Sequence, residues 1–160
     1  RKTPVALHKK INVELKRMEK AAVIYKQEEP TDWVNSMVVV ETPNKIRICI
    51  DPRDLNKAIK REHYPMKTIE EVVQNMPDAK VFTKLDATSG YWQLKLDEES
   101  SKLCTFNTPF GRYRFQRLPF GIVSASEIFQ RVMSQMVEDK DGAEDVMDDI
   151  VVWGKDRKTT

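Results

Sequence analysis

Cysteine and histidine are scarce in this chain of 160 residues, which contains two of each. Cys49 and Cys104 lie far apart in the sequence and form no CxxC pair, and only His8 and His63 could join them around a metal ion. A zinc site is therefore not expected. So few cysteines also favour a reducing compartment over an oxidising one.

Long apolar runs are absent as well. Every apolar run is far shorter than the roughly 20 residues of a membrane-spanning helix, and the N-terminal segment RKTPVALHKK lacks the apolar core of a signal peptide. The sequence shows no internal repeat, no low-complexity stretch and no glycine-rich linker. We expect no membrane partner, and a single domain or two small lobes.

The overall charge excludes little. A content of 40% hydrophobic and 32% charged residues is typical of a soluble globular protein, and the net charge is only +2. Such a charge neither requires nor excludes a nucleic-acid partner, because local patches matter more than the sum.

Strands and helices are predicted in mixed order, without regular βαβ alternation. This order favours an α+β fold with an antiparallel sheet packed on helices. The hydrophobic pattern and the turn signals predict a helix over 5–29, a hairpin with arms at 37–40 and 46–50, a short helix after a Thr68-to-Glu71 capping box, a strand ending in Asp86, a hairpin containing the strand Arg112 to Phe115, a helix over 124–138 and a hairpin over 143–154.

The last of these segments, AEDVMDDIVVWG, contains two adjacent carboxylates between short apolar runs. The runs are rich in β-branched and aromatic residues, so they are predicted to be strands, with Met147, Asp148 and Asp149 in the turn. Carboxylates held at a hairpin tip are suitable ligands for Mg²⁺. A solvated turn is the alternative interpretation, because Asp is common in turns.

A third carboxylate, Asp86, ends a predicted strand. If that strand lies beside the final hairpin, Asp86, Asp148 and Asp149 converge at one edge of a sheet. Their repulsion is unfavourable unless a cation neutralises it. Two Mg²⁺ ions about 3.5–4 Å apart would do so and would support an in-line phosphoryl transfer.

Three longer blocks of sequence make the family resemblance specific. The segments RICIDPRDLNKAIKREHYPMKTIEEV, FTKLDATSGYWQLKLDEESSKLCTFNTPFGRYRFQRLPFGIVSASEIFQ and VMDDIVVWG occur in this order. Together they resemble the fingers segment, the catalytic core and the Y-x-D-D hairpin of reverse transcriptases from LTR retrotransposons of the Gypsy (Ty3) type. The resemblance covers nearly the whole chain.

The resemblance implies a metal site. Asp86 and Asp148 match the two metal-ligand aspartates, the carbonyl of Ala87 matches an additional ligand, and Asp149 matches the last, less essential aspartate. The implied cofactor is a pair of Mg²⁺ ions, for which Mn²⁺ can substitute.

The resemblance also implies a dNTP site. Tyr91 matches the aromatic steric gate that rejects a 2′-hydroxyl, Arg47 matches a basic residue on the triphosphate, and Lys45 could assist it. Phe120 and Gly121 match the segment that lines the nucleotide pocket. The alternatives are core packing for Tyr91 and Phe120 and a solvated strand end for Arg47.

Contacts to the template and primer are a further implication. Lys57, Lys60 and Arg61 are expected to bind template phosphates, with a solvated charged face as the alternative. Val146 and Met147 are expected to bind nucleic acid, and the family residue at the position of Val146 usually lies near the primer end. Val146 stands where the family has tyrosine, which puts fidelity or activity in doubt.

The implied architecture is the fingers and palm of a right-hand polymerase fold, without a thumb. We place the fingers-like region at residues 1–79 and the palm-like region at 80–160. In the family a thumb, a ribonuclease H and an integrase lie downstream in the same polyprotein, so processive synthesis is not expected of this fragment alone.

The resulting hypothesis is an RNA-directed DNA polymerase core that extends a primer on an RNA or DNA template with dNTPs. The family implies that it works in cytoplasmic virus-like particles. The alternatives are an inactive relic that binds nucleic acid, a DNA-templated polymerase, and a nuclease that uses the same carboxylates.

Overall fold

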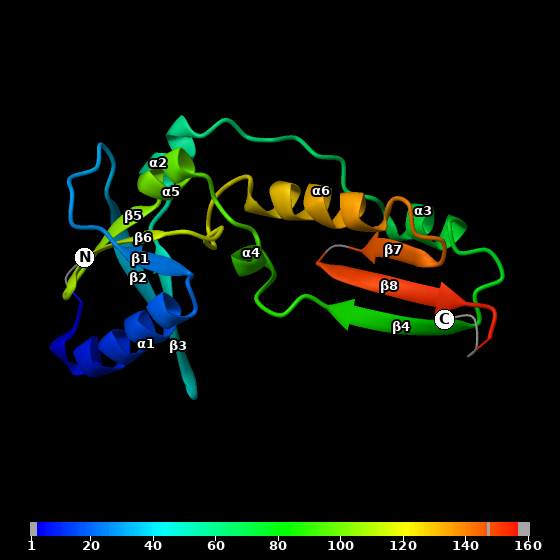
Figure 1. The fold of residues 1–160 in the computed structure, drawn as a ribbon. Coiled ribbons are helices and arrows are strands. Elements are labelled where there is room, and N and C mark those ends of the chain that lie inside the picture. The colour runs from blue at the N-terminus through cyan, green and yellow to red at the C-terminus, as the bar shows by residue number, and fades with distance from the viewer. Residues whose placement is uncertain (1–2, 147, 157–160) are drawn as a thin grey trace. The chain divides into compact units, whose positions relative to one another are not determined.

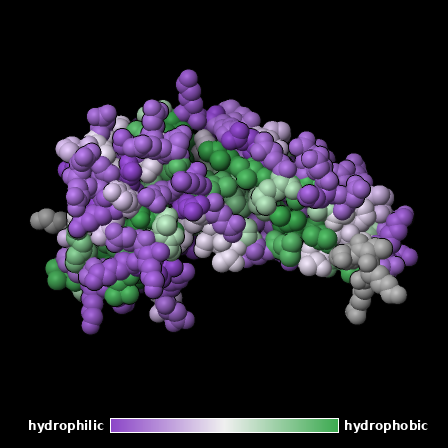
Figure 2. Space-filling view, in the orientation of Figure 1, coloured by the Kyte–Doolittle hydropathy of each residue, from purple (hydrophilic) through white to green (hydrophobic). Residues whose placement is uncertain are grey.

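The computed structural model describes residues 3–146 and 148–156, which form two compact units (Figure 1). Hydrophilic residues make up most of the face shown in Figure 2, with hydrophobic residues visible between them. Unit 1 comprises residues 1–60 and 91–125, and unit 2 comprises residues 61–90 and 126–160. The two units therefore alternate along the chain, whereas the predicted lobes are continuous segments. The assignment of fingers and palm to 1–79 and 80–160 stays a prediction.

Unit 1 is built on a five-stranded sheet with the strand order β1-β6-β5-β2-β3. The pairing of β2 with β5 is parallel, and the other pairs are antiparallel. The elements of unit 1 are η1 (Val5–Leu7), α1 (His8–Lys20), β1 (Ile24–Lys26), β2 (Asn35–Thr42), β3 (Lys45–Ile50), α2 (Arg53–Ala58), α5 (Glu98–Leu103), β5 (Thr105–Thr108) and β6 (Gly111–Phe115), with α4 (Gly90–Gln93) beginning at its boundary.

The core of unit 1 lies between α1 and this sheet. Ile11, Leu15 and Met18 recur at steps of four and three residues on one face of α1 and are fully buried. Helix α1 packs on β1 and β3, where Ile24 and Ile48 are buried as well. The predicted amphipathic helix is thus correct for its first two thirds.

The prediction of helix beyond Lys20 is wrong. Ala22 takes a left-handed conformation (φ 54°), the N–H of Val23 bonds the carbonyl of Met18 at 2.9 Å, and the N–H of Ala22 bonds that of Glu19 at 3.0 Å. This is the hydrogen-bond pattern of a Schellman motif, which ends a helix. The chain then forms β1, which pairs with β6.

The two strand predictions in unit 1 are confirmed. The hairpin of β2 and β3 pairs Met37 with Ile50 through Thr42 with Lys45. In β6 the rings of Tyr113 and Phe115 are buried, while the alternating Arg112 is exposed, as the two-residue period of a strand requires.

Unit 2 has a three-stranded antiparallel sheet in the order β4-β8-β7. Helix α6 lies beside β7 (Figure 1), and its residues Phe129, Met133 and Val137 are buried. The predicted capping box is present, with Thr68 and Glu71 bonded reciprocally at the start of the short helix. The elements are α3 (Ile69–Gln74), β4 (Val81–Asp86), α6 (Ala125–Val137), β7 (Ala143–Val146) and β8 (Asp149–Gly154).

The turn of the last hairpin is shorter than predicted. Asp149 is the first residue of β8 and pairs with Val146, so Asp148 lies in the turn but Asp149 does not. Met147 lies outside the described residues. The pairing fixes Asp149 more firmly than a turn position would.

The α+β prediction is confirmed, with helices packed on mainly antiparallel sheets. Within residues 3–146 and 148–156, none of the helices has the length and apolar character needed to cross a membrane.

Candidate functional site

Two of the predicted carboxylates face each other on neighbouring strands of unit 2. Asp86 ends β4, Asp149 begins β8, and the two are register partners in the antiparallel pair. The side chains of directly opposite residues lie on the same face of a sheet, about 4.5–5.5 Å apart at Cβ, and like charges in this arrangement destabilise it. The sheet thus brings together two carboxylates that favour a cation between them.

The side chain of Lys84 supplies a positive charge beside these carboxylates. The ammonium of Lys84 lies 2.7 Å from Oδ2 of Asp149. Lys84 is two residues before Asp86, so both side chains lie on the same face of β4. The bond to Asp149 and its negative charge, with a smaller contribution from Asp86, raise the pKa of Lys84 above its ordinary value.

The donor set suits a magnesium ion in its chemistry. Carboxylate oxygens at the end of β4 and in the adjacent turn are hard ligands, and Asp148 is exposed in that turn. Within the described part of the chain, however, no three His, Cys, Asp or Glu side chains are grouped as ligands of one ion. The metal-ligand roles of Asp86, Ala87, Asp148 and Asp149 therefore stay predictions.

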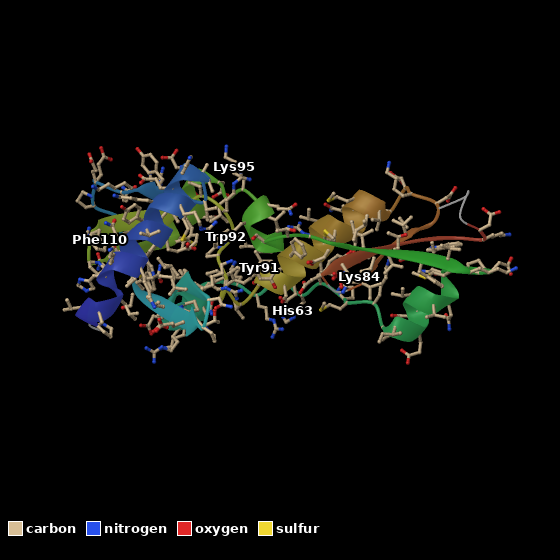
Figure 3. All side chains as sticks on the ribbon, turned by 90° about the horizontal axis from the view of Figure 1, so that it is seen from below. His63, Lys84, Tyr91, Trp92, Lys95 and Phe110 are labelled. Carbon is tan, nitrogen blue, oxygen red and sulfur yellow. The ribbon has the colours of Figure 1, made fainter. Side chains whose placement is uncertain are left out.

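Three of the predicted dNTP-binding residues meet in unit 1. The guanidinium of Arg47 lies 5.0 Å from the centroid of the Phe120 ring, and the rings of Tyr91 and Phe120 are 5.0 Å apart. Trp92 contacts the same ring edge-on, at 6.3 Å. Tyr91 and Trp92 belong to the short helix α4 (Figure 3). The structure thus joins Arg47 and Tyr91 through Phe120, although they are far apart in the sequence.

An asparagine that the sequence did not suggest holds the segment after Phe120. Nδ2 of Asn56 donates to the carbonyl of Gly121, and the N–H of Val123 donates to Oδ1 of Asn56, both at 2.9 Å. Gly121 has φ +99°, and a Cβ there would lie 3.1 Å from Cγ of Pro52. Glycine is therefore required here by its backbone conformation.

Lys45 has a different setting. It lies at the start of β3, where its carbonyl accepts a hydrogen bond from Thr42, and it shares with α1 a cavity of about 480 Å³. Lys45 and Arg47 both point away from the buried face of β3, which carries Ile46 and Ile48.

Two of the three basic residues predicted to contact the template have carboxylate partners. Lys57 bonds Asp54 at 2.8 Å, and Arg61 bonds the buried carboxylate of Glu127 at 2.9 Å. The carbonyl of Lys60 accepts a hydrogen bond from Ser124. Arg61 thus has a structural contact within unit 2, while about half of its side chain remains exposed.

Asp145 is the residue of unit 2 that sequence reasoning missed. It is fully buried in β7 and accepts hydrogen bonds from Gln130 and Ser134 of α6. Lys67 bonds it at 3.0 Å and bonds Glu144 at 2.7 Å. Burial opposes ionisation of Asp145, but the hydrogen bonds from Ser134 and Lys67 outweigh it and lower its pKa. Asp145 thus fixes α6 to the strand that leads to Asp148.

Comparison with known proteins identifies the family that this chain matches. The profile of the family described as "Reverse transcriptase (RNA-dependent DNA polymerase)" matches residues 26–160. The chain is 34% identical over 153 residues to the Retrovirus-related Pol polyprotein from transposon gypsy of Drosophila melanogaster, covering 91% of this chain and 15% of that protein. It is 37% identical over 116 residues to the corresponding polyprotein from transposon 412 of the same species, covering 71% and 9%.

A solved structure shows the same fold at lower identity. The foamy viral protease-reverse transcriptase, in complex with an RNA/DNA hybrid, superimposes with a TM-score of 0.83 at 18% identity, over 99% of this chain and 21% of that one. The chain spans less than a quarter of each of these three proteins.

Proposed function

Because the chain belongs to the reverse transcriptase family, we propose that it is the catalytic part of an RNA-directed DNA polymerase. It extends the 3′-hydroxyl of a primer by attack on the α-phosphate of a dNTP, with release of pyrophosphate. The observation that carries this proposal is the pairing of Asp86 with Asp149, with Asp148 in the adjoining turn.

The carboxylates have the metal-binding role in this proposal. Asp86 and Asp148 would hold two Mg²⁺ ions, with the carbonyl of Ala87 and the carboxylate of Asp149 as further ligands, and Mn²⁺ could replace Mg²⁺. Bound there, the ions supply charge neutralisation to the attacking and leaving oxygens. The protein contributes positioning, because the antiparallel pairing fixes the separation of the two strands.

The aromatic cluster of unit 1 has the nucleotide-binding role. Arg47 binds the triphosphate, and its guanidinium packs over the ring of Phe120. Tyr91 lies beneath the sugar and excludes a 2′-hydroxyl, since its ring is held against Phe120. Gly121 and Lys45 complete the predicted set.

The whole protein is proposed to act on a primed RNA or DNA template. Lys57, Lys60 and Arg61 contribute template contacts, and Val146 and Met147 are proposed as further nucleic-acid contacts because the resemblance implies them. The relatives are much longer polyproteins, so the thumb, ribonuclease H and integrase are expected from downstream sequence. We place the activity in cytoplasmic virus-like particles, as the resemblance implies.

Primer extension tests the proposal. The chain, joined to its native downstream region, is assayed on a primed RNA template with Mg²⁺ and dNTPs, beside Asp148→Asn and the matched control Asp139→Asn, which changes an exposed carboxylate of the same unit. We expect extension by the parent and by the control and none by Asp148→Asn. Equal activity of Asp148→Asn would contradict the proposal.

One observation favours a second candidate, an inactive relic that binds nucleic acid. Val146 replaces the tyrosine of the family at the end of β7. If the protein is such a relic, it should bind a duplex equally well with or without Mg²⁺ and dNTPs, and the folded parent should not extend a primer. Restoring activity with Val146→Tyr would assign the defect to this position.

Two further assays separate the other enzyme candidates. Matched RNA and DNA templates of one sequence distinguish a reverse transcriptase from a DNA-templated polymerase. Cleavage of a labelled duplex without dNTPs would reveal a nuclease that uses the same carboxylates.

A further inference from the structure

Lys84 forms an ion pair with one of the paired carboxylates, and it has no role in the proposed function. It extends from β4 (Figure 3), and its ammonium lies 2.7 Å from Oδ2 of Asp149. The side chain of Lys84 is 67% exposed, whereas that of Asp149 is 25% exposed. The carboxylate is thus the better-fixed partner, and the long lysine side chain can leave it at low cost.

The register places Lys84 beside both carboxylates. Lys84 and Asp86 share one face of β4, because residues two apart in a strand point the same way. Asp149 lies opposite Asp86, and Lys84 lies opposite Val151, so Lys84 reaches Asp149 across the diagonal of the pair. One ammonium therefore offsets the repulsion between two carboxylates that the sheet places directly opposite each other.

We propose that Lys84 is an internal counter-ion of this carboxylate pair and competes with divalent metal for Asp149. The inference rests on the proposed function, because it requires metal binding at these aspartates. In the metal-free protein Lys84 neutralises Asp149 and stabilises the pairing of β4 with β8. Binding of a divalent ion displaces the ammonium into solvent, which is possible because the lysine is on the exposed surface of an edge strand.

Removal of the Lys84 ammonium is expected to lower the stability of the metal-free protein and to raise its affinity for metal. Removal of the ammonium leaves Asp86 and Asp149 facing each other without a counter-ion, so the metal-free protein becomes less stable. The same change frees an oxygen of Asp149, so the ion binds more tightly. A lysine that only stabilised the strand would lower stability without raising metal affinity.

Titration with Mn²⁺ tests the inference without any catalytic readout. The full chain is titrated in its folded state, and free Mn²⁺ is followed by electron paramagnetic resonance. Lys84→Met, which keeps an unbranched side chain one heavy atom shorter, is expected to bind Mn²⁺ about fivefold more tightly, near the upper limit for an exposed ion pair. Lys84→Arg keeps the charge and is expected to bind as the parent does.

Lys155→Met is the matched control. Lys155 forms an exposed ion pair with Asp78, at 3.3 Å in the same unit. Its loss removes the same charge from the chain without touching the paired aspartates, so Mn²⁺ affinity is expected to stay unchanged. An equal gain in Lys155→Met and Lys84→Met would reduce the effect to net charge and overturn the inference.

The Mn²⁺ titrations distinguish failure of the metal site from failure of the counter-ion role of Lys84. If the parent and Asp148→Asn bind Mn²⁺ equally weakly, the metal site and the proposed function fail together with this inference. If Asp148→Asn loses Mn²⁺ binding but Lys84→Met binds as the parent does, only the counter-ion role is overturned. Should Lys84→Met fail to fold, Lys84→Gln and the Mn²⁺-induced rise in melting temperature replace it, with a larger rise expected than in the parent.

Discussion

The side-chain amide of Asn56 in α2 donates a hydrogen bond of 2.9 Å to the backbone carbonyl of Gly121, the residue that follows Phe120. The same asparagine accepts the N–H of Val123. One side chain therefore fixes the loop that carries Phe120, and with it the ring that Arg47 and Tyr91 contact.

Asn56→Asp is expected to weaken this loop. The variant keeps the acceptor for Val123 but places a carboxylate oxygen against the carbonyl of Gly121, where a donor was. We expect the free energy of unfolding at pH 7 to fall by about 1–2 kcal/mol, measured by urea denaturation. Asn107→Asp, at an exposed position of β5, is the control and is expected to change it little. An unchanged midpoint in Asn56→Asp would show that the loop does not depend on the amide.

Gly90→Ala is expected to destabilise unit 2. A Cβ at this position would lie 2.6 Å from Cζ of Phe129, so the ring must shift. Overpacking of this kind costs about 1–3 kcal/mol. A double-mutant cycle with Phe129→Leu measures the clash directly, because the second change removes the ring atoms that Gly90 approaches. Additive effects of the two changes would contradict the close approach.

Acid is expected to weaken the contact between α6 and β7 through Asp145. Hydrogen bonds from Ser134 and Lys67 hold the pKa of Asp145 below its ordinary value despite burial. A lowered folded-state pKa contributes stability above the unfolded value of about 3.9 and loses it as the pH falls through the folded value. Glu144 also faces Lys67 and adds to the charge balance there.

Urea denaturation from pH 7 to pH 2 measures this contribution. Asp145→Asn is expected to be less stable at pH 7 by about 1–3 kcal/mol, because the buried amide has only one of the two acceptor oxygens that Lys67, Gln130 and Ser134 use, and to lose less stability on acidification. Asp139→Asn, an exposed change in the same unit, should follow the parent curve. Parallel curves for Asp145→Asn and the parent would exclude Asp145 as the group responsible.

Tyr91→Val is expected to lower discrimination against ribonucleotides. The ring of Tyr91 lies 5.0 Å from that of Phe120, and its loss opens space where the proposed sugar lies. Filling or emptying a pocket by a small group changes discrimination by about 10–200-fold, so the ratio of kcat/KM for dNTP over rNTP should fall at least tenfold. Trp92→Val, which removes the neighbouring ring of α4, is the control.

Local patterns predicted the elements around the paired carboxylates. The apolar, β-branched and aromatic residues of β4 and β8, the capping box at Thr68 and the apolar spacing of α6 are all read from near neighbours in the sequence. The hypothesis that Asp86 lies beside the final hairpin followed from these elements, and the register of β4 with β8 confirms it.

The missed features depend on unusual backbone or distant partners. The end of α1 has Ala22 in a left-handed conformation, for which glycine is the usual signal, so no glycine marked the end of this helix. In the sequence Asp145 does not differ from other polar strand residues. Its role depends on Lys67, 78 residues away, and on Ser134 of α6, which the fold brings into contact with it. Asn56 acts on Gly121 across 65 residues, and no local pattern reports such a bond.

The pairing of β1 with β6 constrains synthesis of the protein on the ribosome. Ile24 pairs with Phe115, so β1 cannot pair with β6 until 91 further residues have been synthesised. The intervening chain includes β4, which belongs to the other unit. Such long-range closure is slow and leaves apolar strands exposed. Nascent chains that stall before Phe115 should therefore recruit chaperones, whereas those released after it can close their five-stranded sheet.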